Sequence, residues 1–240
     1  MPGATLLTRL RVYDSKAPDG LMSGTPHFHL VCSELYFTLN GDGAVEIIDA
    51  DGFKSIPLPK HSAFLFSPGT LHRLVNTSGD MEVLLVMENS GLPERGDTIA
   101  TFSNETLAND LSYHAAMQAA SLQDAYRRRD AAVSGFLAVK DAFSKSRDEG
   151  RLALDAMYGH ARARTAGRHK EWYDVVTHGS FDEAQSALMD IVSLQNGKTE
   201  QLFDAAHYFM PPVEKNTVGF CGTLNRYFDP ATLLPEGVKI

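Results

Sequence analysis

The sequence predicts a mainly β N-terminal half over residues 1–100, an α-helical region over 101–210 and an irregular C-terminal tail over 211–240. Before residue 100, short runs of β-branched and aromatic residues alternate with Gly, Pro, Asn and Asp. After it, tracts rich in Ala, Leu, Arg and Gln dominate. The last thirty residues are rich in Gly and Pro, and we expect them to pack on the rest of the fold.

The predicted strands of the first half are short and closely spaced. They are Glu34–Leu39, Ala44–Ile48, Ser62–Phe66 and Met81–Met87. Turn signals separate them, at Asn40–Gly43, Asp49–Gly52, Ser67–Gly69 and Asn76–Asp80. Many short strands without intervening helices predict an antiparallel sandwich or a small barrel.

The helical region has an apolar face and two basic clusters. Its apolar residues recur at roughly helical spacing, as at Leu122, Tyr126, Val133, Phe136, Leu137 and Phe143. The clusters are Arg127–Arg129 and His160–Lys170. Neither is interleaved with aromatic residues, so a solvated helix face is favoured over a nucleic-acid site.

Composition and charge indicate which partners and which cellular compartment to expect. The formal net charge is −8, which argues against nucleic acid or an anionic membrane as a partner. Two cysteines in 240 residues favour a reducing compartment. The first residues lack a basic segment followed by a long apolar run, and no stretch could span a bilayer. We therefore expect a cytoplasmic protein without a signal peptide.

Three histidines and one glutamate point most directly to chemistry: His27, His29, Glu34 and His72. Neutral imidazoles and a carboxylate are ligands for a borderline divalent metal ion. His27 and His29 are two residues apart, so both side chains leave one face of a strand. Glu34 is out of phase with them by one residue and joins them only if the chain bends between Leu30 and Ser33. A turn at Pro68–Gly69 precedes His72.

These residues resemble the two signature motifs of the cupin superfamily. In the first, His27-Phe-His29 is followed by Glu34 and, after six further residues, by Gly41. In the second, Pro68-Gly69 leads to His72 and then to Asn76, with one residue fewer between Pro and Gly than the family has. The match covers about residues 20–90. It implies a single-domain RmlC-like jelly roll, also called a double-stranded β-helix barrel.

The resemblance also implies a cofactor and an assembly. By this likeness His27, His29, Glu34 and His72 hold one divalent metal ion, with Fe, Mn, Ni, Co and Zn all compatible. A homodimer is expected, since cupins commonly pair through their sheets. Open metal positions would bind a substrate oxygen or activate water or O₂.

Glu34 and Tyr36 are the candidate catalytic residues, because strand alternation places them on one inner face. A phenol could donate to a substrate or relay a proton, or it could simply line the cavity. Cys32 could be a spare ligand, but a small buried residue in the bend is favoured.

The leading functional hypothesis is a metal-dependent enzyme acting on a small organic molecule, most plausibly a dioxygenase-type oxidoreductase with Fe(II). Six apolar residues suggest a pocket wall that admits O₂: Leu30, Val31, Phe37, Phe64, Phe66 and Leu74. A phosphosugar isomerase needs basic side chains, and the one basic residue beside a ligand, Arg73, points away by alternation. The alternatives are a metal- or ligand-binding sensor without catalysis, and a cupin isomerase, cyclase or lyase.

Overall fold

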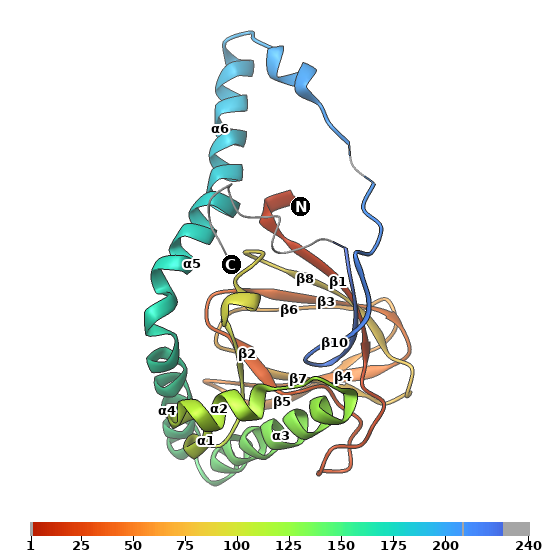
Figure 1. Ribbon diagram of the computed structural model, residues 1–240, viewed down its shortest axis with the longest axis vertical. Helices are drawn as coiled ribbons and strands as arrows, with labels where there is room; N and C mark the ends of the chain where they lie inside the picture. The colour runs from red at the N-terminus through yellow and green to blue at the C-terminus, as the bar shows by residue number, and fades with distance from the viewer. Residues whose placement is uncertain (1, 208, 228–240) are drawn as a thin grey trace.

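The computed structural model describes residues 2–207 and 209–227, which form two antiparallel β-sheets and a helical layer (Figure 1). One sheet has six strands in the order β10-β11-β1-β8-β3-β6, and the other has five in the order β5-β4-β7-β2-β9. The strands are β1 Leu6–Val12, β2 His27–His29, β3 Glu34–Asn40, β4 Gly43–Asp49, β5 Gly52–Leu58, β6 Ala63–Phe66, β7 Leu71–Asn76, β8 Glu82–Met87, β9 Thr98–Ala100, β10 Glu214–Val218 and β11 Gly222–Arg226.

The four predicted strands are confirmed as β3, β4, β6 and β8, and their pairing is largely non-local. Strand β8 lies between β1 and β3, while β7 lies between β4 and β2. All of these pairs are antiparallel. The inner faces of the two sheets share one apolar core, which contains Leu10, Tyr36, Val45, Leu74 and Val83. The mainly β N-terminal half is therefore a two-sheet structure with its core between the sheets.

The helical layer covers the outer face of the five-stranded sheet. Its helices are α1 Asn104–Ala108, α2 Asp110–Met117, α3 Leu122–Lys145, α4 Arg147–Thr165, α5 His169–Val176 and α6 Asp182–Gln195. A second core, which includes Phe28 and Leu71 from the sheet and Phe136 and Met157 from α3 and α4, joins the layers. Helix α5 packs on this body, with its Trp172 and Val175 in one buried cluster with Leu6 and Met87, whereas α6 runs away from it (Figure 1). No helix in the described ranges is long and apolar enough to cross a membrane.

Local signals fix where the long helix α3 begins. The side-chain hydroxyl of Ser121 accepts a hydrogen bond from the backbone N–H of Asp124. The Asp124 carboxylate accepts one from the backbone N–H of Ser121 in return. This reciprocal capping box satisfies two N–H groups that a helix end leaves without partners.

The prediction of an irregular tail over 211–240 is wrong for residues 214–218 and 222–226, which form two strands. Residues Glu214–Val218 and Gly222–Arg226 form a β-hairpin, and β11 pairs with β1 at the edge of the six-stranded sheet. The turn between them passes over the site described below. Residues 228–240 lie outside the described residues. The sequence analysis missed the hairpin because its strands are short and polar, and because β11 pairs with β1, a strand about two hundred residues away, as well as with β10.

Gly135 sets the distance between α3 and the sheet. A Cβ atom there would lie 2.0 Å from the carbonyl oxygen of Thr101 and 2.7 Å from the backbone of Phe102. We expect Gly135→Ala to lower the free energy of unfolding by about 2 kcal/mol, because overpacking outweighs the better helix propensity of alanine. Gly159→Ala in α4 is the matched control, because its Cβ meets nothing within 4 Å. It should raise stability by up to about 1 kcal/mol. Urea unfolding of both variants checks this, and equal shifts would contradict the tight contact.

Candidate metal centre

The two sheets bring His27, His29, Glu34 and His72 together. Their candidate ligand atoms all lie within 4.8 Å of one another, and all four side chains are buried. His27 and His72 are direct partners in the β2–β7 pair. The backbone bends at Leu30 and Val31 before β3 begins at Glu34, as the phase of the sequence required. That bend brings Glu34 into the same group as the histidines.

Outward hydrogen bonds orient the three imidazole rings. Nδ1 of His27 donates to the carbonyl oxygen of Thr25 at 2.8 Å, and Nδ1 of His72 donates to that of Thr70 at 2.8 Å. Nδ1 of His29 lies 3.1 Å from the carboxylate of Asp97. Because a carbonyl oxygen only accepts, the Nδ1 atoms of His27 and His72 carry the protons. The Nε2 atoms of all three rings consequently face inward.

The inward atoms form a donor set that suits a cation. Nε2 of His72 lies 3.2 Å from Nε2 of His27 and 3.4 Å from the Glu34 carboxylate. Nε2 of His29 lies 3.2 Å from the same carboxylate. Two ligand atoms about 2.1 Å from one ion, at tetrahedral or octahedral angles, would lie about 3.0–3.4 Å apart. With Nδ1 protonated, the facing lone pairs of His27 and His72 repel each other unless a cation lies between them. The four residues therefore fit a divalent metal ion.

Burial and neighbouring charge divide the histidines into two kinds. Burial lowers the pKa values of His27 and His72, and the neighbouring imidazoles lower them further. Burial also opposes protonation of His29, but hydrogen bonds to Asp97 and Glu34 outweigh it and raise the pKa to about 9. Burial raises the pKa of Glu34, but its interactions with the His29 and His72 imidazoles hold it well below its usual range. Glu34 is thus a carboxylate, and His27 and His72 are neutral ligands.

Asp97 supports the group and was missed by the sequence analysis. Its side chain is buried completely. One carboxylate oxygen accepts the backbone N–H groups of Leu30 and Val31 at 3.0 and 2.7 Å, and the other faces His29. One residue therefore fixes both the bend before β3 and the orientation of a candidate ligand. Nothing in the local sequence marks it, because its role depends on the pairing of β9 with β2.

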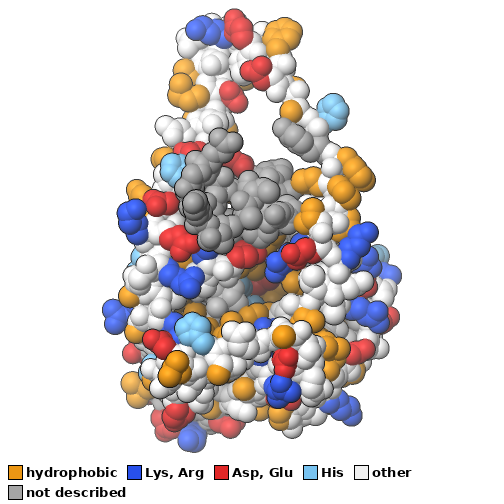
Figure 2. Space-filling view, in the orientation of Figure 1, with side chains coloured by type: hydrophobic (Ala, Val, Ile, Leu, Met, Phe, Trp, Pro, Cys, Tyr) orange, Lys and Arg blue, Asp and Glu red, His pale blue; other side chains and the backbone are white. Residues whose placement is uncertain are grey.

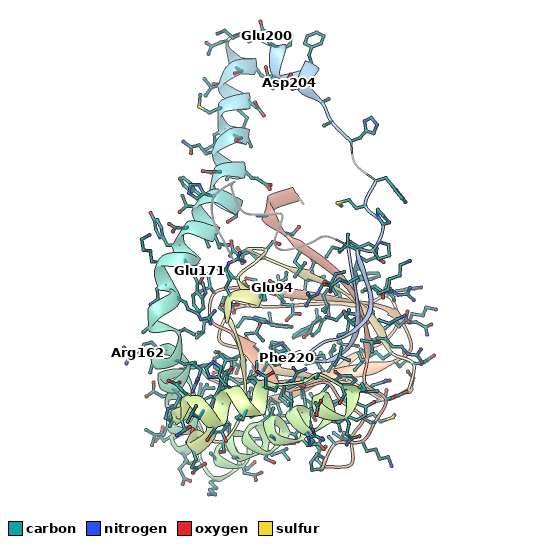
Figure 3. The ribbon with its side chains drawn as sticks, viewed as in Figure 1. Glu94, Arg162, Glu171, Glu200, Asp204 and Phe220 are labelled. Atoms are coloured by element: carbon teal, nitrogen blue, oxygen red, sulfur yellow. The ribbon has the colours of Figure 1, made fainter. Side chains whose placement is uncertain are left out.

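A cavity of about 600 Å³ opens from this group, with His27, His29, Glu34 and Tyr36 in its wall. None of the six apolar residues suggested by the sequence lines it. Its apolar wall comes instead from Leu6, Leu10, Leu85, Met87, Ile99 and Phe220. The last of these belongs to the tail turn and lies where the tail passes between the strands and α2 and α3 (Figure 3). Figure 2 shows a hollow on this face, with apolar and charged side chains at its rim.

Tyr36 lies beside the candidate ligands, as alternation predicts. Its ring is 1% exposed and packs edge-on against Phe66, with its centroid 6.1 Å from that of His72. Burial, followed by the charge of Glu34, raises its pKa well above 10.0, so the side chain is a phenol. It can donate a proton or a hydrogen bond but cannot act as a base. Cys32 is buried in the bend, as favoured.

Cys221 and Phe220 are site neighbours that the sequence analysis did not identify. The Cys221 sulfur lies 3.8 Å from Nδ1 of His27, and the Phe220 ring centroid lies 5.2 Å from that of the His27 ring. Burial raises the pKa of Cys221, so it is a thiol. Both residues come from the turn before β11, about two hundred residues from the first motif.

The interpretation of Arg127–Arg129 as a solvated helix face is wrong for two of its three residues. Arg127 is exposed, but Arg128 and Arg129 are 8% and 1% exposed. Arg129 donates to the carbonyl oxygens of Ser15 and Lys16 and so fixes the loop after β1. Arg128 faces the cavity. The sequence analysis ranked an isomerase lower because it considered basic residues of the barrel alone, and the helical region supplies Arg128, Arg164 and Arg168 to the cavity wall.

Two facing antiparallel sheets, joined by non-local pairings and carrying three histidines and a glutamate inside, decide the fold class. The N-terminal half has a cupin-type fold. No protein-family model matches the chain, and no curated protein sequence does.

Several solved structures are similar to this cupin half. Pac13 from Streptomyces, a nucleoside dehydratase, matches at 16% identity with a TM-score of 0.28, over 37% of this chain and 62% of its own. WlaRA from Campylobacter jejuni, a TDP-fucose-3,4-ketoisomerase, matches at 20% identity and a TM-score of 0.29, over 33% of this chain and 58% of its own. An oxalate oxidase with bound glycolate matches at 17% identity and a TM-score of 0.27, over 36% and 51%. Each match spans less than two thirds of the solved chain.

Proposed function

We propose that this protein is a metal-dependent enzyme that acts on a small organic substrate within the cupin cavity. The observation that carries the proposal is the position of the donor set. Three imidazoles and one carboxylate converge, and His27, His29 and Glu34 of this set line a cavity of about 600 Å³, which is large enough for a small molecule. Three neutral ligands and one carboxylate leave a divalent ion with net positive charge and with room for further ligands.

His27, His29, Glu34 and His72 would hold the ion. When bound, it would supply Lewis-acid chemistry, or O₂ chemistry if it is Fe(II), and Mn, Ni, Co and Zn fit the same ligands. Glu34 contributes the single negative charge of the set. Tyr36, held as a phenol beside Glu34, would donate a hydrogen bond or a proton to the substrate. The apolar wall and the tail turn would exclude bulk water from the reacting groups.

A dioxygenase-type oxidoreductase remains the first reaction class to test. The support is an apolar wall on the strands nearest the donor set, from Leu10, Leu85 and Met87. An isomerase or lyase is the second candidate. It is favoured by the arginines that the helical region supplies to the cavity wall, because these could bind a polar or charged substrate. The non-enzymatic alternative is a sensor that binds metal without catalysing a reaction.

Oxygen uptake separates these candidates. Metal-free protein is loaded anaerobically with Fe(II) and then exposed to O₂ with a panel of phenolic and diketone compounds, with zinc-loaded protein as the control. Uptake with iron that depends on both a compound and His72 supports the dioxygenase. Substrate turnover without O₂ uptake assigns an isomerase or lyase. No turnover across metals and compounds, with metal bound, contradicts the enzyme and leaves the sensor.

The raised pKa of His29 predicts a pH dependence of the metal-free protein. An imidazole has an ordinary pKa of 6.5, and the folded value is about 9, so folding binds a proton at this site. Its stabilisation is complete below about pH 6.5 and is lost as the pH rises through 9, to a total on the order of 3 kcal/mol. Urea unfolding of chelator-treated protein between pH 6.5 and 9 should show this fall. Zinc-loaded protein should not show it, because a ligated Nε2 carries no proton. A flat profile without metal would contradict a protonated His29.

A further inference from the structure

Arg128 is a buried cation without a carboxylate partner. It is 8% exposed, and no carboxylate among residues 2–207 and 209–227 lies within ion-pair distance of its guanidinium. The other buried arginines have such partners: Arg73 pairs with Glu46 and Asp19, Arg95 with Glu171, and Arg129 with Asp130. Removing a cation from water without a counter-charge is unfavourable, so an anion bound beside it would stabilise this site.

Arg128 uses one N–H of each terminal nitrogen for a backbone carbonyl oxygen and also hydrogen-bonds the Tyr13 hydroxyl, so its five N–H groups are not all used. Nη2 donates to the carbonyl oxygen of Gly219 at 2.5 Å, and Nη1 reaches that of Met117 at 3.4 Å. Nε is buried and has no hydrogen-bond partner. Burial lowers the pKa of this arginine. The residue lines the same cavity as the candidate metal ligands. A free N–H group on a planar guanidinium suits a carboxylate or phosphate oxygen.

Phe220 relates this cation to the donor set. Arg128 lies over the Phe220 ring with Cζ 4.4 Å from its centroid, and the same ring lies 5.2 Å from that of His27. One aromatic ring therefore separates the arginine from the nearest candidate ligand. A small molecule could contact both groups at once.

Two further arginines of the helical region line the cavity. Arg164 is paired with Asp110, but its Nε is buried and has no hydrogen-bond partner. Arg168 donates to the carbonyl oxygen of Arg95 and has no carboxylate partner among the described residues. Against them stands Glu94, an exposed acid in the same wall. The helical side of the cavity is thus net cationic.

We propose that Arg128, with Arg164 and Arg168 beside the same cavity, binds the carboxylate or phosphate group of an acidic small molecule. The opposite end of that molecule lies at His27, His29, Glu34 and His72. That this end is where a reaction occurs rests on the function proposed above, whereas the anion site does not. The helical region then supplies the substrate-recognition half of a site whose metal half comes from the cupin strands.

Calorimetric titration of the chelator-treated full-length protein at fixed ionic strength tests the anion site. Benzoate, malonate and inorganic phosphate are the probes, and benzamide is the neutral match for benzoate. We expect at least one anion to bind, and benzoate, if it binds, to bind at least about tenfold more tightly than benzamide. Preference for phosphate over the carboxylates would identify the ligand as a phosphate ester. Failure of all three anions to bind, or equal binding of benzoate and benzamide, would overturn the proposal.

Single substitutions test whether the anion binds at Arg128. Arg128→Gln should lower the affinity for the anion by about tenfold or more, because charge-assisted hydrogen bonds are lost. Arg127→Gln is the matched control on the preceding, exposed residue, which pairs with Asp124, and it should leave the affinity unchanged. Equal affinities of Arg128→Gln and the wild type would overturn the assignment.

A crystal structure of the wild-type protein with 4-bromobenzoate gives the same answer if Arg128→Gln does not fold. Anomalous scattering from bromine locates the ring, and we expect the carboxylate at the Arg128 guanidinium. A molecule bound only elsewhere would contradict the proposal. The titrations use metal-free protein, so failure of the proposed enzymatic function would leave their results unchanged.

Discussion

Replacing His72 with alanine is expected to abolish stoichiometric metal binding. His72 is 0% exposed, and its Nε2 lies 3.2 and 3.4 Å from two of the other three ligand atoms. The substitution removes one ligand of four. The affinity should therefore fall by more than the roughly 10–100-fold that loss of an outer-shell partner costs. Elemental analysis of purified protein after dialysis against zinc, together with competition against a chromophoric chelator, measures the change.

A second histidine provides the control for this experiment. His61 is exposed in the turn before β6 and has a φ of +67°, a conformation that asparagine tolerates. His61→Asn should bind metal as the wild type does. If His72→Ala retained full occupancy and affinity, His72 would not be a ligand, and the convergence of β2 and β7 would need another explanation.

Replacing Asp97 with asparagine is expected to lower metal affinity by about 10–100-fold without removing any ligand. The amide oxygen can still accept the N–H groups of Leu30 and Val31, so the NH₂ group would face Nδ1 of His29. Nδ1 would then have to accept, and the ring proton would move to Nε2, which faces the site. The substitution therefore selects the tautomer that cannot bind metal.

Glu88 offers a matched control for Asp97. Its carboxylate accepts the backbone N–H of Ser33 at the other end of the same bend, but it is exposed and contacts no candidate ligand. Glu88→Gln should leave metal affinity within about twofold of the wild type, as expected for a surface substitution. If the two variants bound metal equally well, the tautomer argument would be wrong. Spectra of cobalt-loaded protein would report whether the remaining ligands keep their arrangement.

The metal half of the site could be predicted because its information is local. His27 and His29 lie on one strand face because they are two residues apart, and a single bend brings Glu34 into phase with them. The resemblance to the cupin motifs predicted His72 as a ligand and predicted the two-sheet fold. Tyr36 followed from alternation along β3. Each of these steps needs only strand geometry and residue type.

The other half of the cavity could not be predicted, because it depends on contacts between distant segments. Arg128 and Arg127 are neighbours in a basic run, and only the packing of α3 decides which one is buried. Phe220 reaches the site because β11 pairs with β1. Asp97 acts through β9, a strand of three residues. The preference for an oxygenase over an isomerase assumed a cavity poor in basic groups, and the arginines of the helical region remove that premise.

The central claim is that His27, His29, Glu34 and His72 hold one divalent metal ion. X-ray diffraction from crystals of protein purified without chelators, recorded above and below the absorption edge of the metal found by elemental analysis, tests it most directly. We predict one anomalous peak per chain, about 2.0–2.2 Å from the three Nε2 atoms and from the Glu34 carboxylate. Fully occupied metal elsewhere in the chain, or crystals grown with excess Fe(II) or Zn(II) and no peak among these four residues, would contradict it.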